Sequence, residues 1–215
     1  MSDSTLRQAV IDELTWQPGV SAAHIGVTAS DGVVTLMGHV GTYMEKWNAE
    51  RAAGRVSGVK GVANELEVRY PLSDKKEDDD IAKNALQALA WDIEVPDNKV
   101  KVKVEKGWVT LTGTVDWYYQ KNAAEADVRK LHGVTGVSNN ITILPSVQAT
   151  DVRDRIQAAL KRNAQIEADN ITVTAEGEKV TLNGKVKTWA EDNLVVDTAW
   201  LAPGVTQVVD RLTVG

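Results

Sequence analysis

The apolar positions of the first 70 residues change their spacing along the chain, and the changes predict five elements. A spacing of three to four residues over 6–14 and again over 49–56 predicts two amphipathic helices. Alternation of apolar and polar residues over 25–29, 34–40 and 62–68 predicts three strands, each with one buried face. The order α-β-β-α-β predicts an α+β fold in which two helices cover one face of a three-stranded sheet.

The same order of elements occurs three times. The pattern Val-Thr-Leu-x-Gly-x-Val begins at Val34, Val109 and Val180, so the second and third copies follow at offsets of 75 and 71 residues. The apolar helix positions before this pattern and a Gly-Val pair after it keep the same offsets, which predicts tandem copies of one unit. The predicted domains span residues 5–70, 80–145 and 151–215.

A glycine interrupts the second strand of every unit, at Gly38, Gly113 and Gly184. Glycine weakens a strand unless another group must approach the backbone closely. The small residues Ala49 and Ala53 on the second helix indicate that this helix is the group that approaches.

Two connectors separate the predicted units. Residues 71–79 begin with a proline and are highly charged, which predicts a solvated linker. The acidic run over 74–80 lacks the glycine and the ligand spacing of a calcium loop, so a solvated segment is the favoured interpretation. Residues 146–150 form a shorter connector, which we expect to limit the motion of the second and third units.

Composition and charge narrow the classes of function. The net charge of −6 argues against the broad basic surface of a nucleic-acid-binding protein, and the absence of cysteine excludes thiolate nucleophiles and cysteine-based metal sites. His24, His39 and His132 are not spaced like metal ligands, so we expect no enzyme, no cofactor and no resident metal. No apolar stretch approaches the ~20 residues of a membrane span. No secretory signal precedes the first helix pattern, which predicts a cytoplasmic protein or one peripheral to a membrane.

Aromatic residues gather where the second strand of each unit ends and the second helix begins. Tyr43, Tyr118 and Trp189 occupy one aligned position. A helix N-terminus favours anionic groups such as phosphate, and Trp and Tyr suit a boundary between lipid and water. Two interpretations fit: the rings bind an anionic phospholipid surface or a protein partner, or they pack one unit against the next. The full set of candidate residues in this cluster is Tyr43, Trp47, Trp117, Tyr118, Tyr119 and Trp189.

Other aromatic and basic residues have simpler interpretations. Trp16 and Trp91 end the first helices of their units and are predicted to cover the cores. Lys99, Lys101 and Lys103 alternate along a strand and so share one face. They are candidates to meet lipid headgroups, although protection of a sheet edge against aggregation is the favoured interpretation.

The repeated unit resembles the BON domain (bacterial osmotically inducible and nodulation) along nearly the whole chain. Gly38, Gly113 and Gly184 match the characteristic glycine of that family. Asn64-Glu65-Leu66 and Asn139-Asn140-Ile141 match its closing motif, whereas the third unit has Asp210 in place of the asparagine. The resemblance implies a stress-induced protein, periplasmic or membrane-associated in most relatives, with phospholipid surfaces as the proposed ligand. Some relatives are chaperone-like, and one cytoplasmic relative senses potassium.

We therefore expect a non-enzymatic, tandem BON-domain protein associated with stress or the cell envelope, which binds phospholipid membranes or partner proteins. Avidity from linked units would strengthen weak individual contacts. The alternatives are a cytoplasmic sensor of a monovalent cation such as potassium, of a divalent cation or of a small ligand, and a chaperone-like scaffold.

Overall fold

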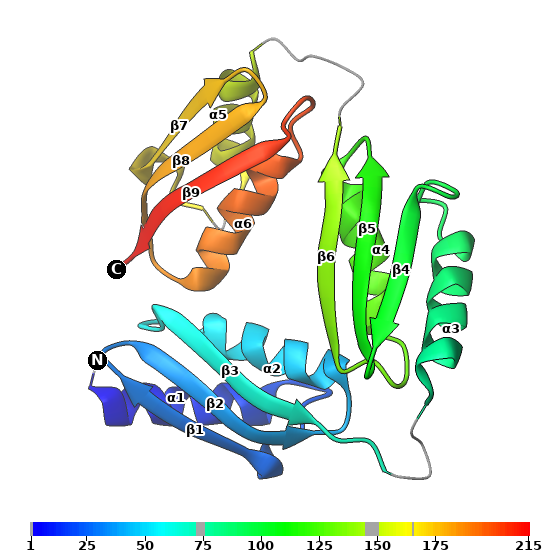
Figure 1. The fold of residues 1–215 in the computed structure, drawn as a ribbon. Helices are drawn as coiled ribbons and strands as arrows, with labels where there is room; N and C mark the ends of the chain where they lie inside the picture. Colours follow the sequence, from blue (N-terminus) through cyan, green and yellow to red (C-terminus); the bar gives the residue numbers. More distant parts are fainter. Residues whose placement is uncertain (1, 72–75, 145–150, 165) are drawn as a thin grey trace.

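The computed structural model describes residues 2–71, 76–144, 151–164 and 166–215, and it contains three α+β units (Figure 1). The predicted connector at 146–150 and residues 72–75 of the first connector lie outside the described residues. In each unit two helices cover one face of a three-stranded sheet, as the sequence predicts.

The helices and strands follow the same order in every unit. Unit 1 contains α1 (Asp3–Trp16), the short 3-10 helix η1 (Ala22–His24), β1 (Ile25–Ser30), β2 (Val33–Val40), α2 (Tyr43–Gly54) and β3 (Gly61–Val68). Unit 2 contains α3 (Asp78–Trp91), β4 (Val100–Glu105), β5 (Trp108–Val115), α4 (Tyr118–Arg129) and β6 (Gly136–Ile143). Unit 3 contains α5 (Val152–Arg162), η3 (Ala168–Asn170), β7 (Ile171–Glu176), β8 (Lys179–Val186), α6 (Trp189–Trp200) and β9 (Gln207–Val214).

Each sheet has the second strand of its unit in the middle. In unit 1, β1 pairs with β2 in antiparallel fashion, and β3 joins the other side of β2 in parallel. Units 2 and 3 repeat this arrangement. The parallel pair needs a crossover connection, and the second helix of each unit provides it.

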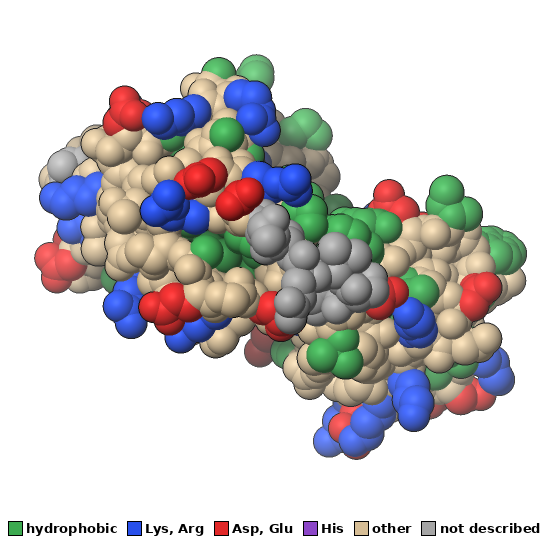
Figure 2. All heavy atoms as spheres, turned by 90° about the horizontal axis from the view of Figure 1, so that it is seen from above, with side chains coloured by type: hydrophobic (Ala, Val, Ile, Leu, Met, Phe, Trp, Pro, Cys, Tyr) green, Lys and Arg blue, Asp and Glu red, His purple; other side chains and the backbone are tan. Residues whose placement is uncertain are grey.

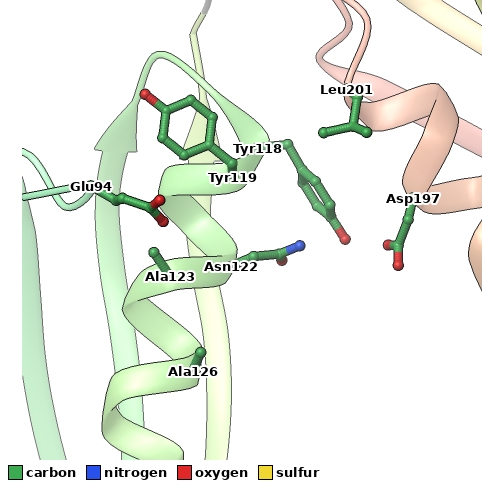
Figure 3. A pocket seen from close by; sticks show the side chains of 8 residues that line it. All are labelled: Glu94, Tyr118, Tyr119, Asn122, Ala123, Ala126, Asp197 and Leu201. Atoms are coloured by element: carbon green, nitrogen blue, oxygen red, sulfur yellow. The ribbon is translucent and has the colours of Figure 1, made fainter. Parts of the chain in front are cut away.

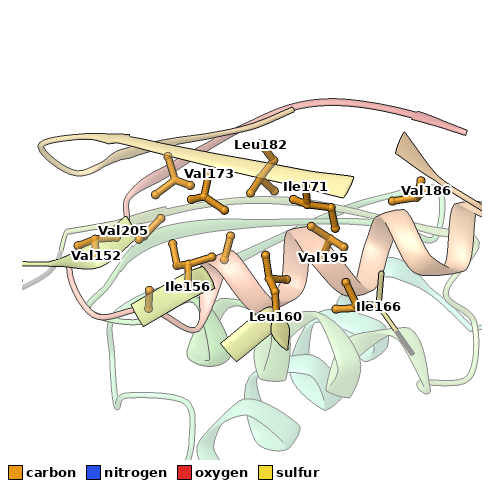
Figure 4. Close-up of a cluster of buried hydrophobic side chains, with 13 residues drawn as sticks. Val152, Ile156, Leu160, Ile166, Ile171, Val173, Leu182, Val186, Val195 and Val205 are labelled. Carbon is orange, nitrogen blue, oxygen red and sulfur yellow. The ribbon is translucent and has the colours of Figure 1, made fainter. Parts of the chain in front are cut away.

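Every unit has its own hydrophobic core between helices and sheet. Figure 4 shows the core of unit 3, where Ile156 and Leu160 of α5 point toward Val173 and Leu182 on the strands. These four side chains are at most 2% exposed. The helix spacing of four and the strand spacing of two read from the sequence therefore mark the buried positions correctly.

The glycine of the second strand faces a different neighbour from the one that the sequence indicated. Gly113 has a φ of +142°, and a Cβ built on it would lie 2.0 Å from the carbonyl oxygen of Lys99, just before the adjacent strand. Gly38 and Gly184 make the equivalent approach. The expectation that the helix bearing Ala49 and Ala53 approaches these glycines is wrong, because the closest atom belongs to the residue that precedes the neighbouring strand.

The end of the first connector is more ordered than a solvated linker. Asp78 and Asp79 belong to the first turn of α3. The Asp78 carboxylate accepts hydrogen bonds from the backbone N–H groups of Lys106 and Gly107 at 2.7 and 2.8 Å. This carboxylate ties the start of the helix to the turn between β4 and β5.

In units 1 and 2 a lysine and an asparagine fasten the second helix to the last strand. Lys46 Nζ donates to the carbonyl oxygen of Leu66 at 2.7 Å. Asn64 Nδ2 donates to the carbonyl oxygen of Lys46 at 3.3 Å and to the Glu50 carboxylate at 2.9 Å. The closing asparagine motif is therefore a bond between helix and sheet. The residues that make the same contacts in unit 2 are Lys121, Asn139 and Glu125.

Unit 3 replaces this group with two carboxylates. Asp192 occupies the lysine position and Asp210 the asparagine position, while Val196 takes the place of the glutamate. The Asp192 residue is 7% exposed. Its burial, together with the neighbouring Asp210 carboxylate, raises the pKa of Asp192 to about 7. Asp210 keeps one contact of the asparagine, since its Oδ1 accepts from the backbone N–H of Leu212 at 2.8 Å.

Replacing the strand glycine of unit 2 tests the close backbone approach. We expect Gly113→Ala to lower the free energy of unfolding by about 3 kcal/mol, because the methyl group meets a backbone oxygen and φ is positive. Gly177→Ala is the matched control: Gly177 also has a positive φ, but a Cβ placed on it would have no atom within 4 Å, and we expect a loss of about 1 kcal/mol. Urea denaturation measures both, and equal losses would contradict this explanation.

The carboxylate pair predicts that unit 3 loses stability as pH rises. The pKa of Asp192 is higher in the folded state, so the folded protein holds its proton more tightly than the unfolded chain does. The resulting stabilisation is present at pH 4 and is lost as pH approaches 7. We expect a loss of about 2 to 3 kcal/mol over this interval in urea denaturation.

Asp210→Asn should reduce this pH dependence, because it removes the neighbouring carboxylate charge and keeps the bond to Leu212, while the burial of Asp192 remains. Asp169→Asn, at an exposed carboxylate of unit 3, is the control and should leave the dependence as it is. A pH profile that Asp210→Asn does not change would show that the pair is not its source.

Candidate binding surface at the junctions between the units

The second helices of the three units meet head to tail in a triangle (Figure 1). The first residue of each helix is the aligned aromatic residue, and it lies at the last turn of another second helix. The start of α2 meets the end of α4, the start of α4 meets the end of α6, and the start of α6 meets the end of α2. Each corner brings the positive end of one helix dipole to the negative end of the next.

At the corner between units 1 and 2, an aromatic ring is covered by cations. The Trp47 ring centroid lies 3.9 Å from the guanidinium carbon of Arg129 and 4.6 Å from that of Arg51. Tyr43 packs against the core of unit 2, and burial raises the pKa of its hydroxyl, opposed mainly by the backbone of Val137. This corner is therefore filled by side chains of both units.

A second contact joins units 1 and 2. Tyr70 donates from its hydroxyl to the carbonyl oxygen of Val134 at 2.9 Å. Its ring also meets His132 edge to face, at a centroid distance of 4.7 Å. Tyr70 lies at the end of unit 1, next to the connector, so the chain is held against unit 2 where it leaves unit 1.

The other two corners use aromatic contacts of a different kind. Tyr118 stacks on Trp200 of unit 3, with centroids 4.6 Å apart and planes 10° from parallel. Trp189 lies beside Gly54 and Gly61 of unit 1, where a Cβ added to either glycine would approach its side chain to 4.0 Å. With Tyr43, these contacts place the aligned aromatic residue of each unit against another unit.

The structure separates the aromatic residues that the sequence grouped. Tyr43, Tyr118 and Trp189, with Trp47, are half-buried, and their contacts match the interpretation that they pack one unit against the next. Tyr119 is 43% exposed. Lipid or partner binding by any of these rings stays a prediction.

Lys99 lies near Trp117 at one end of the sheet of unit 2, whereas Lys103 lies toward the other end, near the turn between β4 and β5. Trp117 is half-buried at the residue before α4. Lys99, Lys101 and Lys103 are exposed on one face. Lys99 pairs with Asp116 at 2.9 Å and Lys103 with Glu105 at 3.0 Å, which partly neutralises that face.

An open cleft of about 380 Å³ lies between unit 2 and unit 3, beside the stacked rings (Figure 3). Glu94 and Asp197 stand on opposite sides of it, with Tyr118 and Asn122 between them. Burial raises the pKa of Asp197, and the charge of Arg51 opposes this effect. Burial also raises the pKa of the Tyr118 hydroxyl. The residues that line the cleft are Glu94, Tyr118, Tyr119, Asn122, Ala123, Ala126, Asp197 and Leu201.

Exposed apolar side chains lie in this cleft or next to its lining residues in the chain. Ile93, next to Glu94 in the chain, is fully exposed, and Leu201 in the wall is 67% exposed. Figure 2, seen from above the view of Figure 1, shows hydrophobic side chains grouped where the two lobes meet. We call Trp91, Ile93, Tyr119, Leu201 and the cleft the apical surface.

The prediction that Trp16 and Trp91 cover the cores is wrong. Trp16 is 82% exposed and Trp91 is 77% exposed. Both lie two residues after the last apolar position of the helix stripe, Leu14 or Leu89, and two residues turn a helix by about 200°. That spacing was visible in the sequence. The acidic residues Glu94 and Asp197, in contrast, come together only through the arrangement of the units, which no local pattern reveals.

The described part of the chain contains neither a membrane-spanning helix nor a cluster of metal ligands. None of its helices combines the length and apolarity needed to cross a bilayer. Within the same residues, no three metal-ligating His, Cys, Asp or Glu side chains come together.

Comparison with known proteins gives clear matches in sequence. The family model described as "BON domain" matches residues 2–70, 77–145 and 148–215. Osmotically-inducible protein Y of Escherichia coli (strain K12) is 33% identical over 150 residues, which cover 66% of this chain and 72% of that protein.

Solved structures add little. A structure of CdsD, a structural protein of the Type III secretion system of Chlamydia trachomatis, aligns over 98% of this chain and 92% of that chain, at 15% identity and a TM-score of 0.27. The C-terminal domain of CdsD aligns over both whole chains, at 16% identity and a TM-score of 0.26. Likenesses this distant carry no argument about arrangement or function.

The stacked pair at the corner of units 2 and 3 should be energetically coupled. We expect Tyr118→Ala to lower the free energy of unfolding by about 2 kcal/mol, and the double-mutant cycle with Trp200→Ala to give a coupling of about 1 kcal/mol. Small-angle X-ray scattering should show a larger radius of gyration for both single variants, since the corner opens. Tyr119→Ala is the matched control and should add to Trp200→Ala without coupling. Additive effects of Tyr118→Ala and Trp200→Ala would mean that the stacked rings contribute no coupling energy to the contact between units 2 and 3.

Proposed function

Because the chain belongs to the BON domain family, we propose that it is a stress-related, non-enzymatic binding protein that holds polypeptide partners at its apical surface. The identity with an osmotically inducible protein supports the link to stress. The observation that carries the proposal is the exposure of Trp91 and Ile93, 77% and 100%, in the chain segment next to Glu94, which lines a cleft that two units form together. Exposed apolar groups that gather around a concave surface are typical of a protein-binding site.

The charges around this surface favour a polypeptide over an anionic membrane. Glu94 and Asp197 line the cleft, and the whole chain carries a net charge of −6. Carboxylates next to apolar side chains repel anionic lipid headgroups, whereas they attract the basic groups of a protein segment. The half-buried aromatic residues at the corners support a scaffold role, because they keep the surfaces of the units in a fixed arrangement.

A phospholipid surface is the second candidate, and a specific observation favours it. Trp16 and Trp91 both end the first helix of their unit and are highly exposed, and tryptophan is suited to the interface of a membrane. Co-sedimentation with vesicles of mixed anionic and zwitterionic phospholipid at low salt tests it. If vesicle binding falls with both Trp16→Ala and Trp91→Ala, a phospholipid surface is supported as the ligand, and absence of binding removes this candidate. Cation sensing and a cytoplasmic location stay predictions from the sequence.

The polypeptide proposal is tested by protection of an aggregating protein. We expect the chain to suppress light scattering from reduced, unfolded lysozyme, and the double variant Trp91→Ala/Ile93→Ser to lose at least half of that suppression. Both side chains are exposed, so the variant should keep its melting temperature. Trp16→Ala removes an equally exposed tryptophan from unit 1 and is the control. Suppression that depends equally on Trp16 and Trp91 would argue against a site at the apical surface, and absence of suppression would remove the proposal.

A further inference from the structure

The cleft exists because one corner of the helix triangle lacks side chains that another corner has. At the corner of units 1 and 2, the ring of Trp47 and the guanidinium groups of Arg51 and Arg129 occupy the space between the helices. In unit 2, the positions aligned with Trp47 and Arg51 hold Asn122 and Ala126. Both are smaller, and both line the cleft. The same backbone arrangement therefore leaves an open space where its counterpart holds an aromatic ring under a cation.

The charged groups of the cleft are of one sign. Glu94 comes from the loop after α3 and Asp197 from α6, and they face the space from opposite sides (Figure 3). The eight described residues that line the cleft include no lysine, arginine or histidine. Arg51, whose guanidinium group lies beside Trp47, acts on Asp197 through its charge. Two carboxylates on a partly apolar surface recognise a cation.

The remaining walls suit a planar cation on an alkyl stem. The rings of Tyr118 and Tyr119 offer aromatic surface beside the carboxylates, and Ala123 and Ala126 offer small apolar contacts. A guanidinium group stacks on aromatic rings and pairs with carboxylates, and it is less strongly hydrated than an ammonium group. The contact between Arg129 and Trp47 shows that this chain already uses such a pair at the aligned corner.

We propose that the cleft between α4 and α6 binds an arginine side chain that a partner polypeptide presents within an apolar segment. The apolar neighbours of that arginine contact two exposed side chains, Leu201 in the wall of the cleft and Ile93, which is next to Glu94 in the chain. This assignment rests on the proposed function and narrows it, since it names the residue type that the apical surface selects.

Titration calorimetry with the full chain and three synthetic peptides tests the proposal. The first peptide has one arginine flanked by leucines; the second has citrulline, which keeps the shape and removes the charge; and the third has glutamate. We expect the arginine peptide to bind at least tenfold more tightly than the citrulline peptide, and the glutamate peptide to show no measurable binding.

Variants locate the binding at the cleft. Glu94→Gln and Asp197→Asn should each lower the affinity for the arginine peptide by about three- to tenfold and leave the affinity for the citrulline peptide unchanged. Glu176→Gln, an exposed carboxylate on β7 away from the cleft, is the control and should change nothing. Asn122→Trp introduces the ring that Trp47 provides at the aligned corner, and it should fill the cleft, block the arginine peptide and preserve the melting temperature.

The outcomes separate this inference from the proposed function. Equal binding of the arginine and citrulline peptides, lost in Trp91→Ala/Ile93→Ser, overturns the arginine site and leaves polypeptide binding standing. If Glu176→Gln weakens binding of the arginine peptide as much as Asp197→Asn does, the arginine site is also overturned, because the attraction is then a general effect of net charge. Failure of all three peptides, together with failure to protect lysozyme, removes both proposals. Binding of phosphatidylethanolamine vesicles in place of any peptide, sensitive to Asp197→Asn, assigns the carboxylates to a lipid headgroup and overturns the arginine site.

Discussion

The arrangement of this protein depends on one contact made three times: the aromatic residue that begins a second helix lies against the last turn of another second helix. Tyr43, Tyr118 and Trp189 make it, and the contacts follow one another around a triangle. A head-to-tail interface leads to a closed ring only when its rotation closes, and here it closes after three units. Small units have small cores, so burial at three corners adds stability that a single unit cannot supply.

Repetition explains how one fold can carry three different corners. The last residue of the second helix is Gly54, Arg129 or Trp200. Trp189 lies beside Gly54, the Trp47 ring lies against the guanidinium group of Arg129, and Tyr118 stacks on Trp200. The backbone contact stays the same while the side chains diverge, and the cleft is one result of that divergence. The carboxylate pair of unit 3 is another, since it stands where units 1 and 2 keep a lysine and an asparagine.

Much of the fold could be predicted from the sequence, because the signals for it are local. The stripe of Leu6, Val10 and Leu14 marks a buried helix face, and the repeated offsets identify three units with separate cores. The group that approaches Gly113, the carbonyl of Lys99, could not be identified from the sequence. Its position depends on strand register, which is set by hydrogen bonds between segments, and the spacing of apolar residues does not reveal which carbonyl lies there.

The candidate site was predictable only in part. Aligned aromatic residues at a helix start are visible in the sequence, and two uses for them stayed open until their partners were known. Trp200 and Asp197 meet Tyr118 across a unit boundary. These residues are far apart in the sequence, so the local spacing of apolar residues does not predict that they meet. Trp16 and Trp91 do not cover the cores, because their angle on the helix places them outside the buried stripe, although their size and apolarity are typical of core residues.

The number of units in the ring is itself a constraint. A head-to-tail triangle has no spare ends: each helix start is matched to a helix end, and the chain satisfies all three within one molecule. Two units of this kind would leave one start and one end unmatched, and a unit of a second molecule would complete the triangle. Three copies in a single polypeptide thus satisfy within one chain an interface that would otherwise bring separate molecules together.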